Sequence, residues 1–142
     1  MTLLLVDVAN VVGSRPDGWW RDRAGAAERL LARLAELPGR RLTGPDGRPL
    51  DVDGVVAVVE GQAHAARAPD GVRVVRATGS GDDALASCAT ELAAARESLL
   101  VVTADRGLRA RLPEGTPVTG PGWLLDALDQ LDRPGNGTGR GG

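Results

Sequence analysis

Four short aliphatic runs occur along the chain. Each has consecutive apolar residues, whereas a strand with one face in water would alternate apolar and polar residues. They lie at residues 3–8, 55–59, 72–75 and 99–102. A strand inside a parallel sheet is covered on both faces, so it alternates little between apolar and polar residues. The runs therefore predict the strands of a mainly parallel sheet.

Helical patterns separate these runs. The first places Leu30, Leu31, Leu34 and Leu37 on one side of a helix. The predicted helices are residues 21–37, 82–96, 106–112 and 122–131. Parallel neighbours need a crossover, which is usually a helix. The alternation predicts a three-layer α/β/α fold with a central, mostly parallel sheet.

The chain of 142 residues fits one domain, because a chain of this size buries about 68–70% of its unfolded surface. We expect that domain to span residues 1–132. Residues 39–53 are rich in Gly, Pro and charged residues, which indicates a hairpin-like excursion around the turn at residues 45–48. The Gly-rich tail, residues 133–142, is expected to be disordered.

Composition narrows the functional classes. No stretch approaches the roughly 18 apolar residues that cross a bilayer, so we expect a cytoplasmic protein without a membrane partner. All 17 basic residues are arginine, which excludes catalysis by lysine, and the single Cys88 cannot form an internal disulfide. The net charge of −2 argues against a general nucleic-acid coat protein but leaves room for a local basic groove.

Four aspartates follow the predicted strands: Asp7, Asp82, Asp83 and Asp105. Asp7 interrupts the first aliphatic run near its end, where an uncompensated buried charge would cost several kcal/mol. It could accept hydrogen bonds from backbone N–H groups of the loop at residues 10–14, or it could hold a cation. A position in a strand offers it no role as a helix cap.

The other three aspartates have a structural alternative. Ser80 and Asp83 have the spacing of a capping box, and Asp105 stands where a helix cap is expected. An adjacent pair, Asp82 and Asp83, is more negative charge than a cap requires. In an open α/β sheet the carboxyl ends of the strands meet at one crevice, which is where such folds bind ligands.

Carboxylates brought together repel one another, and oxygen ligands suit a hard divalent cation, for which Mg²⁺ and Mn²⁺ are the candidates. Such a metal site suits hydrolysis of phosphodiesters. With one histidine and one cysteine, the sequence supports no Ser-His-Asp or Cys-His pair, no phosphate-binding glycine loop and no zinc-type spacing.

Three segments together resemble the NYN branch of the PIN-domain ribonucleases: residues 3–11 (LLLVDVANV), 79–84 (GSGDDA) and 101–109 (VVTADRGLR). In that family an Asp followed by Asn ends the first strand, an Asp pair opens a middle helix, and a Ser/Thr-x-Asp segment with a following Arg comes after the fourth strand. Val8 stands where many relatives have glycine.

The resemblance implies a metal-dependent endoribonuclease fold over about residues 1–131. It implies that Asp7, Asp83 and Asp105 are catalytic and, with Asp82, bind metal. The residues that match the remaining motif positions, and so would contact substrate, are Asn10, Thr103 and Arg109.

Further substrate contacts are expected from the residues themselves. Trp19 and Arg21 could stack on and neutralise single-stranded RNA, or Trp19 could simply anchor the first long helix. Glu60, at the end of the second run, could be a second acid of the site or face solvent. His64 could lie over the same crevice, although a surface histidine without a role is the simpler interpretation.

Two other functions remain open at this point. A nucleotide (NTP) pyrophosphohydrolase could use a similar acidic Mg²⁺ site, but it usually carries glutamates in ExxE spacing, which this chain lacks. A catalytically degenerate PIN-like domain could bind RNA or a protein without cleaving it.

Overall fold

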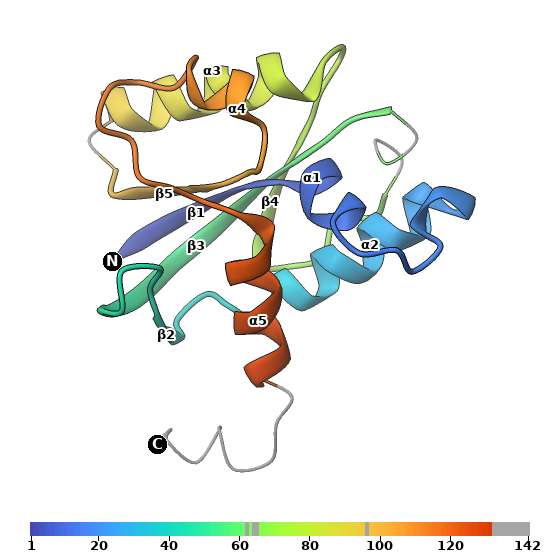
Figure 1. Ribbon diagram of the computed structural model, residues 1–142, viewed down its shortest axis with the longest axis horizontal. Coiled ribbons are helices and arrows are strands. Elements are labelled where there is room, and N and C mark those ends of the chain that lie inside the picture. The colour runs from blue at the N-terminus through green and yellow to red at the C-terminus, as the bar shows by residue number, and fades with distance from the viewer. Residues whose placement is uncertain (62, 64–65, 96, 132–142) are drawn as a thin grey trace.

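A computed structural model describes residues 1–61, 63, 66–95 and 97–131 of the chain (Figure 1). His64 and the tail at residues 133–142, on which predictions were made above, lie outside these residues. None of the helices in the described ranges combines the length and the apolar character that a membrane span requires.

In the described part of the chain, six strands form one sheet around a central strand, β1. The strands are β1 (Thr2–Asp7), β2 (Arg41–Thr43), β3 (Pro49–Val59), β4 (Val72–Arg76), β5 (Leu99–Val102) and β6 (Val118–Thr119). The order β4-β3-β1-β5-β6 is parallel throughout, as the aliphatic runs predicted. Because β1 pairs with both β3 and β5, its carboxyl end lies in the middle of one sheet edge.

The strand β2 is the antiparallel member, pairing with the first residues of β3. The two strands form the predicted hairpin, whose turn contains Gly47 at a φ of 83°. The turn is closed by the Gly44 amide, which donates to the Arg48 carbonyl, and by the Arg48 amide, which donates to the Asp46 carboxylate. A left-handed conformation favours glycine at this position.

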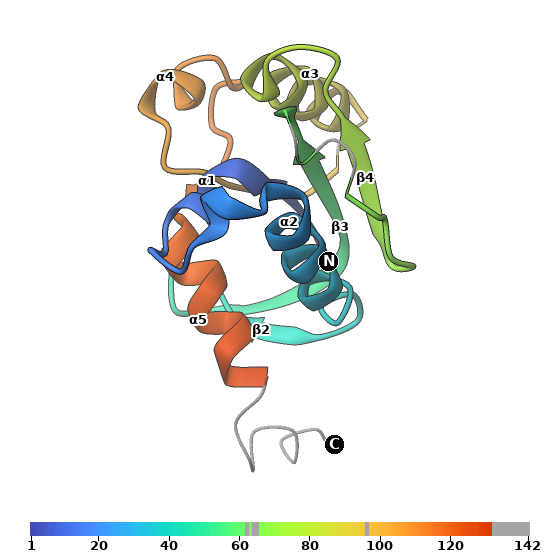
Figure 2. The same cartoon turned by 90° about the vertical axis from the view of Figure 1, so that its right-hand side faces the viewer.

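Helices cover both faces of the sheet (Figure 2). On one face lie α1 (Val8–Gly13), α2 (Arg23–Leu34), which follows the short 3₁₀ turn η1 (Trp19–Arg21), and α5 (Pro121–Leu131). On the other face lie α3 (Gly81–Ala94) and α4 (Arg106–Arg109). The two faces follow the alternation of a strand. In β1, Leu4 and Val6 pack towards α2 and α5, whereas Leu5 packs towards α3.

The start of the chain differs in one respect from the sequence prediction. The first strand ends at Asp7 rather than at residue 8, and the helix α1 follows at once. Val8 is 1% exposed and packs in the core. The predicted helix at residues 21–37 is shorter, beginning at Arg23 and ending at Leu34.

Candidate carboxylate site

Asp7 is the buried carboxylate at the end of the central strand, with 6% of its surface exposed. Its Oδ2 accepts a hydrogen bond from the Thr103 hydroxyl at 3.0 Å, and its Oδ1 accepts one from the Asn10 amide at 3.3 Å. Asp7 is thus the N-cap of α1, a role that its expected position inside a strand did not suggest. The expected hydrogen bond from the loop that follows is confirmed at Asn10.

Asn10 and Thr103 join Asp7 to the segment after β5. The side-chain oxygen of Asn10 accepts from the Ala104 amide at 2.8 Å. The Thr103 hydroxyl, fully buried, also accepts from the Asp105 amide at 3.1 Å, while Asp105 itself caps α4 by accepting from the Leu108 amide. Asn10 and Thr103 therefore orient two carboxylates that lie 98 positions apart in the chain.

Burial dominates the charge state of Asp7. Burial raises the pKa of Asp7, the hydrogen bonds from Thr103 and Asn10 lower it, and the charges of Asp82 and Glu60 raise it again. The net direction is upwards from 3.8. Two further carboxylates, Asp82 and Glu60, therefore face the buried one closely enough to disfavour its ionisation.

Asp82 faces the same group of acids from the first turn of α3. Burial raises its pKa, the charges of Asp105 and Glu60 raise it further, and Arg111 opposes them. When Asp82 is protonated it shares a hydrogen bond with Asp105, which also raises its pKa. The acids Asp7, Glu60, Asp82 and Asp105, named the carboxylate group from here on, thus come from four strand ends and lie at one edge of the sheet.

Glu60 lies against the beginning of α3. Its Oε2 accepts a hydrogen bond from the Gly81 amide at 2.8 Å. A Cβ atom on Gly81 would lie 2.6 Å from the other oxygen, Oε1, so glycine is the residue that lets this carboxylate approach the helix. Of the two interpretations left open for Glu60, this position excludes a purely solvent-facing side chain.

The neighbouring Asp83 points elsewhere. Its side chain is 71% exposed and accepts a hydrogen bond from Arg111 at 2.6 Å. A single helical step turns a side chain by about 100°, which separates Asp83 from the direction of Asp82. Ser80 caps both amides, of Asp82 and Asp83, so the predicted helix cap is present as well.

The carboxylate group supplies the oxygen ligands and the excess negative charge that suit Mg²⁺ or Mn²⁺. Within the described ranges, however, no three His, Cys, Asp or Glu side chains are placed to hold one metal ion among them. Mg²⁺ usually keeps several waters and binds through one or two carboxylates together with substrate phosphates. These carboxylates therefore fit Mg²⁺ or Mn²⁺, because one or two of them can bind the ion without three ligands converging in the free protein.

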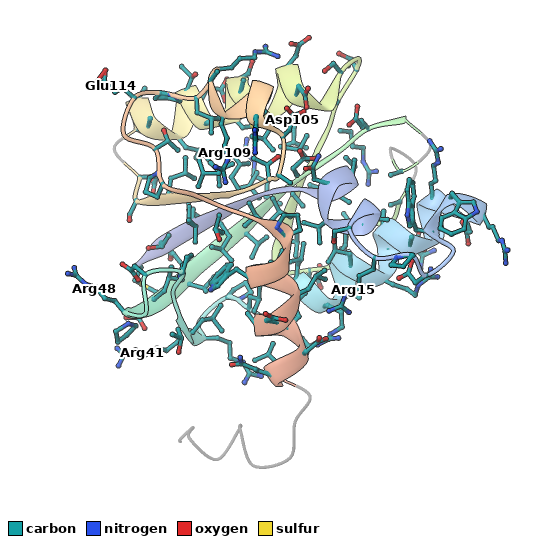
Figure 3. All side chains as sticks on the ribbon, viewed as in Figure 1. Arg15, Arg41, Arg48, Asp105, Arg109 and Glu114 are labelled. Carbon is teal, nitrogen blue, oxygen red and sulfur yellow. The ribbon has the colours of Figure 1, made fainter. Side chains whose placement is uncertain are left out.

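The expected substrate side chains lie in two places. Arg109 is exposed on α4, one helical turn after Asp105, and Figure 3 labels both side chains. Trp19 and Trp20 pack edge to face with centroids 6.0 Å apart. The Arg21 guanidinium lies 6.0 Å from the Trp20 ring, and that of Arg23 lies 5.4 Å from the Trp19 ring.

Arg111 and Gly81 are two participants that sequence reasoning missed. Arg111 follows the resembling segment at residues 101–109 by two positions, so no motif marks it. Gly81 precedes the predicted helix at residues 82–96 and stands in a Gly-Ser-Gly segment, where glycine is ordinary in a turn, so no pattern marked it either.

Comparison with known proteins supports the fold. The computed structure is similar to the crystal structure of Rae1 (YacP) from Bacillus subtilis, a W164L mutant, with a TM-score of 0.67 and 21% identity. The match covers 94% of this chain and 78% of the other. No family model matches the sequence, and no curated protein matches it. The predicted α/β/α fold with a central, mostly parallel sheet is confirmed.

Proposed function

We propose that this protein is a metal-dependent ribonuclease that hydrolyses phosphodiester bonds of single-stranded RNA at the carboxylate group. One observation carries the proposal: hydrogen bonds through Thr103 join the buried Asp7 to Asp105, and the charges of Asp82 and Glu60 act on Asp7. Folding has brought four acids to the carboxyl edge of a parallel sheet, which is where open α/β folds bind ligands.

Mutual repulsion within the carboxylate group favours a cation. The pKa values of Asp7 and Asp82 are both raised in part by the charges of neighbouring acids. A divalent ion bound by one or two of these carboxylates would relieve that repulsion. When bound, Mg²⁺ or Mn²⁺ supplies a water of lowered pKa and neutralises charge on phosphoryl oxygens.

The chain's own residues then have distinct tasks. Thr103 and Asn10 hold Asp7 and the loop that carries Asp105 in fixed positions through the hydrogen bonds at 3.0 Å and 2.8 Å. Arg109, exposed one helical turn after Asp105, would neutralise a substrate phosphate. Trp19 with the arginines around η1 is placed to bind bases and backbone of an unpaired strand.

The test is cleavage of single-stranded RNA with Mn²⁺, comparing wild type with Asp7→Asn and Asp82→Asn. Both variants keep the side-chain size and remove one charge, and we expect each to lower the rate by at least about 10–100-fold. Asp83→Asn is the matched comparison, because it removes the same charge one residue away from Asp82. A smaller loss in this variant is expected from the exposed position of Asp83.

Equal cleavage by wild type and Asp7→Asn, or no cleavage by wild type across several RNAs, would overturn the proposal. If wild type cleaves no RNA but still binds RNA when metal is chelated, the protein is a binding domain without catalysis. That alternative has a specific observation in its favour, since no three acids among the described residues are placed around one ion.

A further inference from the structure

A cavity of about 250 Å³ borders the carboxylate group. Its apolar wall is formed by Val8, Val12 and Ala27, and its polar boundary by Trp19, Arg23 and Glu60. Because Glu60 also belongs to the carboxylate group, the cavity and the acids share a wall. Neither the resemblance to ribonucleases nor the carboxylates themselves account for this space.

The size of the cavity restricts what can enter. Pockets for drug-sized ligands measure about 300–1,000 Å³, so this cavity takes a smaller group. The Trp19 ring, with the Arg23 guanidinium 5.4 Å from its centroid, offers an aromatic and cationic surface. Such surfaces bind unstacked bases, since every base has a π-face.

The polar atoms at the boundary match a base better than an aliphatic group. Glu60 uses Oε2 to accept from the Gly81 amide, and within the described ranges Oε1 has no hydrogen-bond donor. That oxygen can accept from an N–H group on a base edge, while Arg23 can donate to a base carbonyl or ring nitrogen. An aliphatic occupant would offer no hydrogen bond to Oε1 of Glu60.

We propose that this cavity receives one unpaired nucleobase of the RNA substrate and thereby positions the adjoining phosphate at the carboxylate group. The inference rests on the proposed function and adds what the RNA substrate must have, an unpaired nucleotide next to the cleaved phosphate. A paired base lies inside a stack and cannot enter a pocket, so the strand must be unpaired at that nucleotide.

The experiment measures binding of a short single-stranded RNA in the presence of EDTA, by fluorescence anisotropy. A series of RNAs, each with one nucleotide lacking its base, identifies the base that enters the cavity. Stacking of one base on an aromatic side chain corresponds to about 5–150-fold in affinity, and we expect a loss in that range at one position of the series.

A cavity-filling variant provides the second measurement. Ala9 is exposed on α1 and lines the cavity, so Ala9→Phe fills the space without disturbing the core. We expect Ala9→Phe to bind intact RNA as weakly as wild type binds the abasic RNA. Removing the base should not weaken the affinity of Ala9→Phe any further. Ala32→Phe, at an exposed position of α2 outside this cavity, is the matched control and should bind as wild type does.

The outcomes separate this inference from the proposed function. The base pocket is overturned if every abasic RNA loses the same affinity. It is also overturned if Ala9→Phe binds RNA as tightly as Ala32→Phe. Either result holds even if the protein cleaves RNA with Mn²⁺. Pocket-dependent binding without cleavage supports the pocket and overturns the ribonuclease proposal. Absence of RNA binding in EDTA overturns the base pocket, whereas the ribonuclease proposal is decided separately by cleavage with Mn²⁺.

Discussion

Replacing Gly81 by alanine tests the contact between Glu60 and the start of α3. The new Cβ would lie 2.6 Å from Oε1 and 2.7 Å from Cδ of Glu60, closer than real Cβ contacts, so the carboxylate must move away. The hydrogen bond from the Gly81 amide, 2.8 Å long, would be lost. A hydrogen bond to a charged group contributes about 1.5–3 kcal/mol.

Alanine also stabilises a helix relative to glycine, by about 0.5–1 kcal/mol. The difference leaves Gly81→Ala destabilised by about 0.5–2.5 kcal/mol. For a chain of this size each kcal/mol corresponds to about 4 °C in Tm. Thermal unfolding followed by circular dichroism, together with a urea titration at 25 °C, measures the change.

Repeating the substitution in a Glu60→Ala variant isolates the contribution of this contact. With Glu60→Ala, the clash and the hydrogen bond are both absent, so Gly81→Ala should become stabilising by about 0.5–1 kcal/mol. Gly79→Ala is the matched control, because a Cβ on Gly79 meets no atom within 4 Å. If Gly81→Ala is as stable as Gly79→Ala, or if its effect has the same sign with and without Glu60, the reasoning about this contact is refuted.

Three further predictions concern the acids and their supports. Burial raises the pKa of Asp7 in the folded state, so the folded protein loses stability as the pH rises from about 3.8 through the raised pKa. Asp7→Asn carries no such charge and should therefore have a higher Tm than wild type at pH 7. The difference in Tm should vanish below pH 3.8. Equal Tm values at pH 7 would contradict this. Thr103→Val removes a buried donor to Asp7 and should cost about 1.5–3 kcal/mol in urea titrations, whereas Thr103→Ser should cost clearly less. Asp83→Asn breaks an exposed ion pair with Arg111 and should change stability by at most about 1 kcal/mol, so a larger loss would show that this pair is structural.

The sheet could be predicted from the sequence because its strands are buried on both faces. Runs such as residues 55–59 have no polar residue to place in water, and only a covered strand explains them. The helix α1 was missed for a related reason. Val8 continues the aliphatic run of β1, and the β-branched Val11 and Val12 have only modest helix preference, so the sequence favoured a strand to residue 8 followed by a loop. Burial under α2 and α5 overrides that preference.

The composition of the carboxylate group was predictable only in part. Asp7 and Asp105 follow strands whose ends must meet, and topology alone brings them to one edge. Asp82 and Asp83 differ by one residue on a helix, and which of them faces Asp7 depends on the rotation that the Ser80 cap and the packing of Leu85 impose. No sequence pattern specifies that rotation, and the interpretation that favoured Asp83 came from the family resemblance.

Binding of Mn²⁺ tests the central claim most directly, because it requires no knowledge of the RNA sequence. The paramagnetic resonance signal of free Mn²⁺ measures how much ion the protein takes up. We predict saturable binding to wild type and to Asp83→Asn, and an affinity weaker by at least about 10–100-fold in Asp7→Asn and Asp82→Asn. Absence of binding to wild type, or equal affinity in all four proteins, would contradict the assignment of a metal to the carboxylate group.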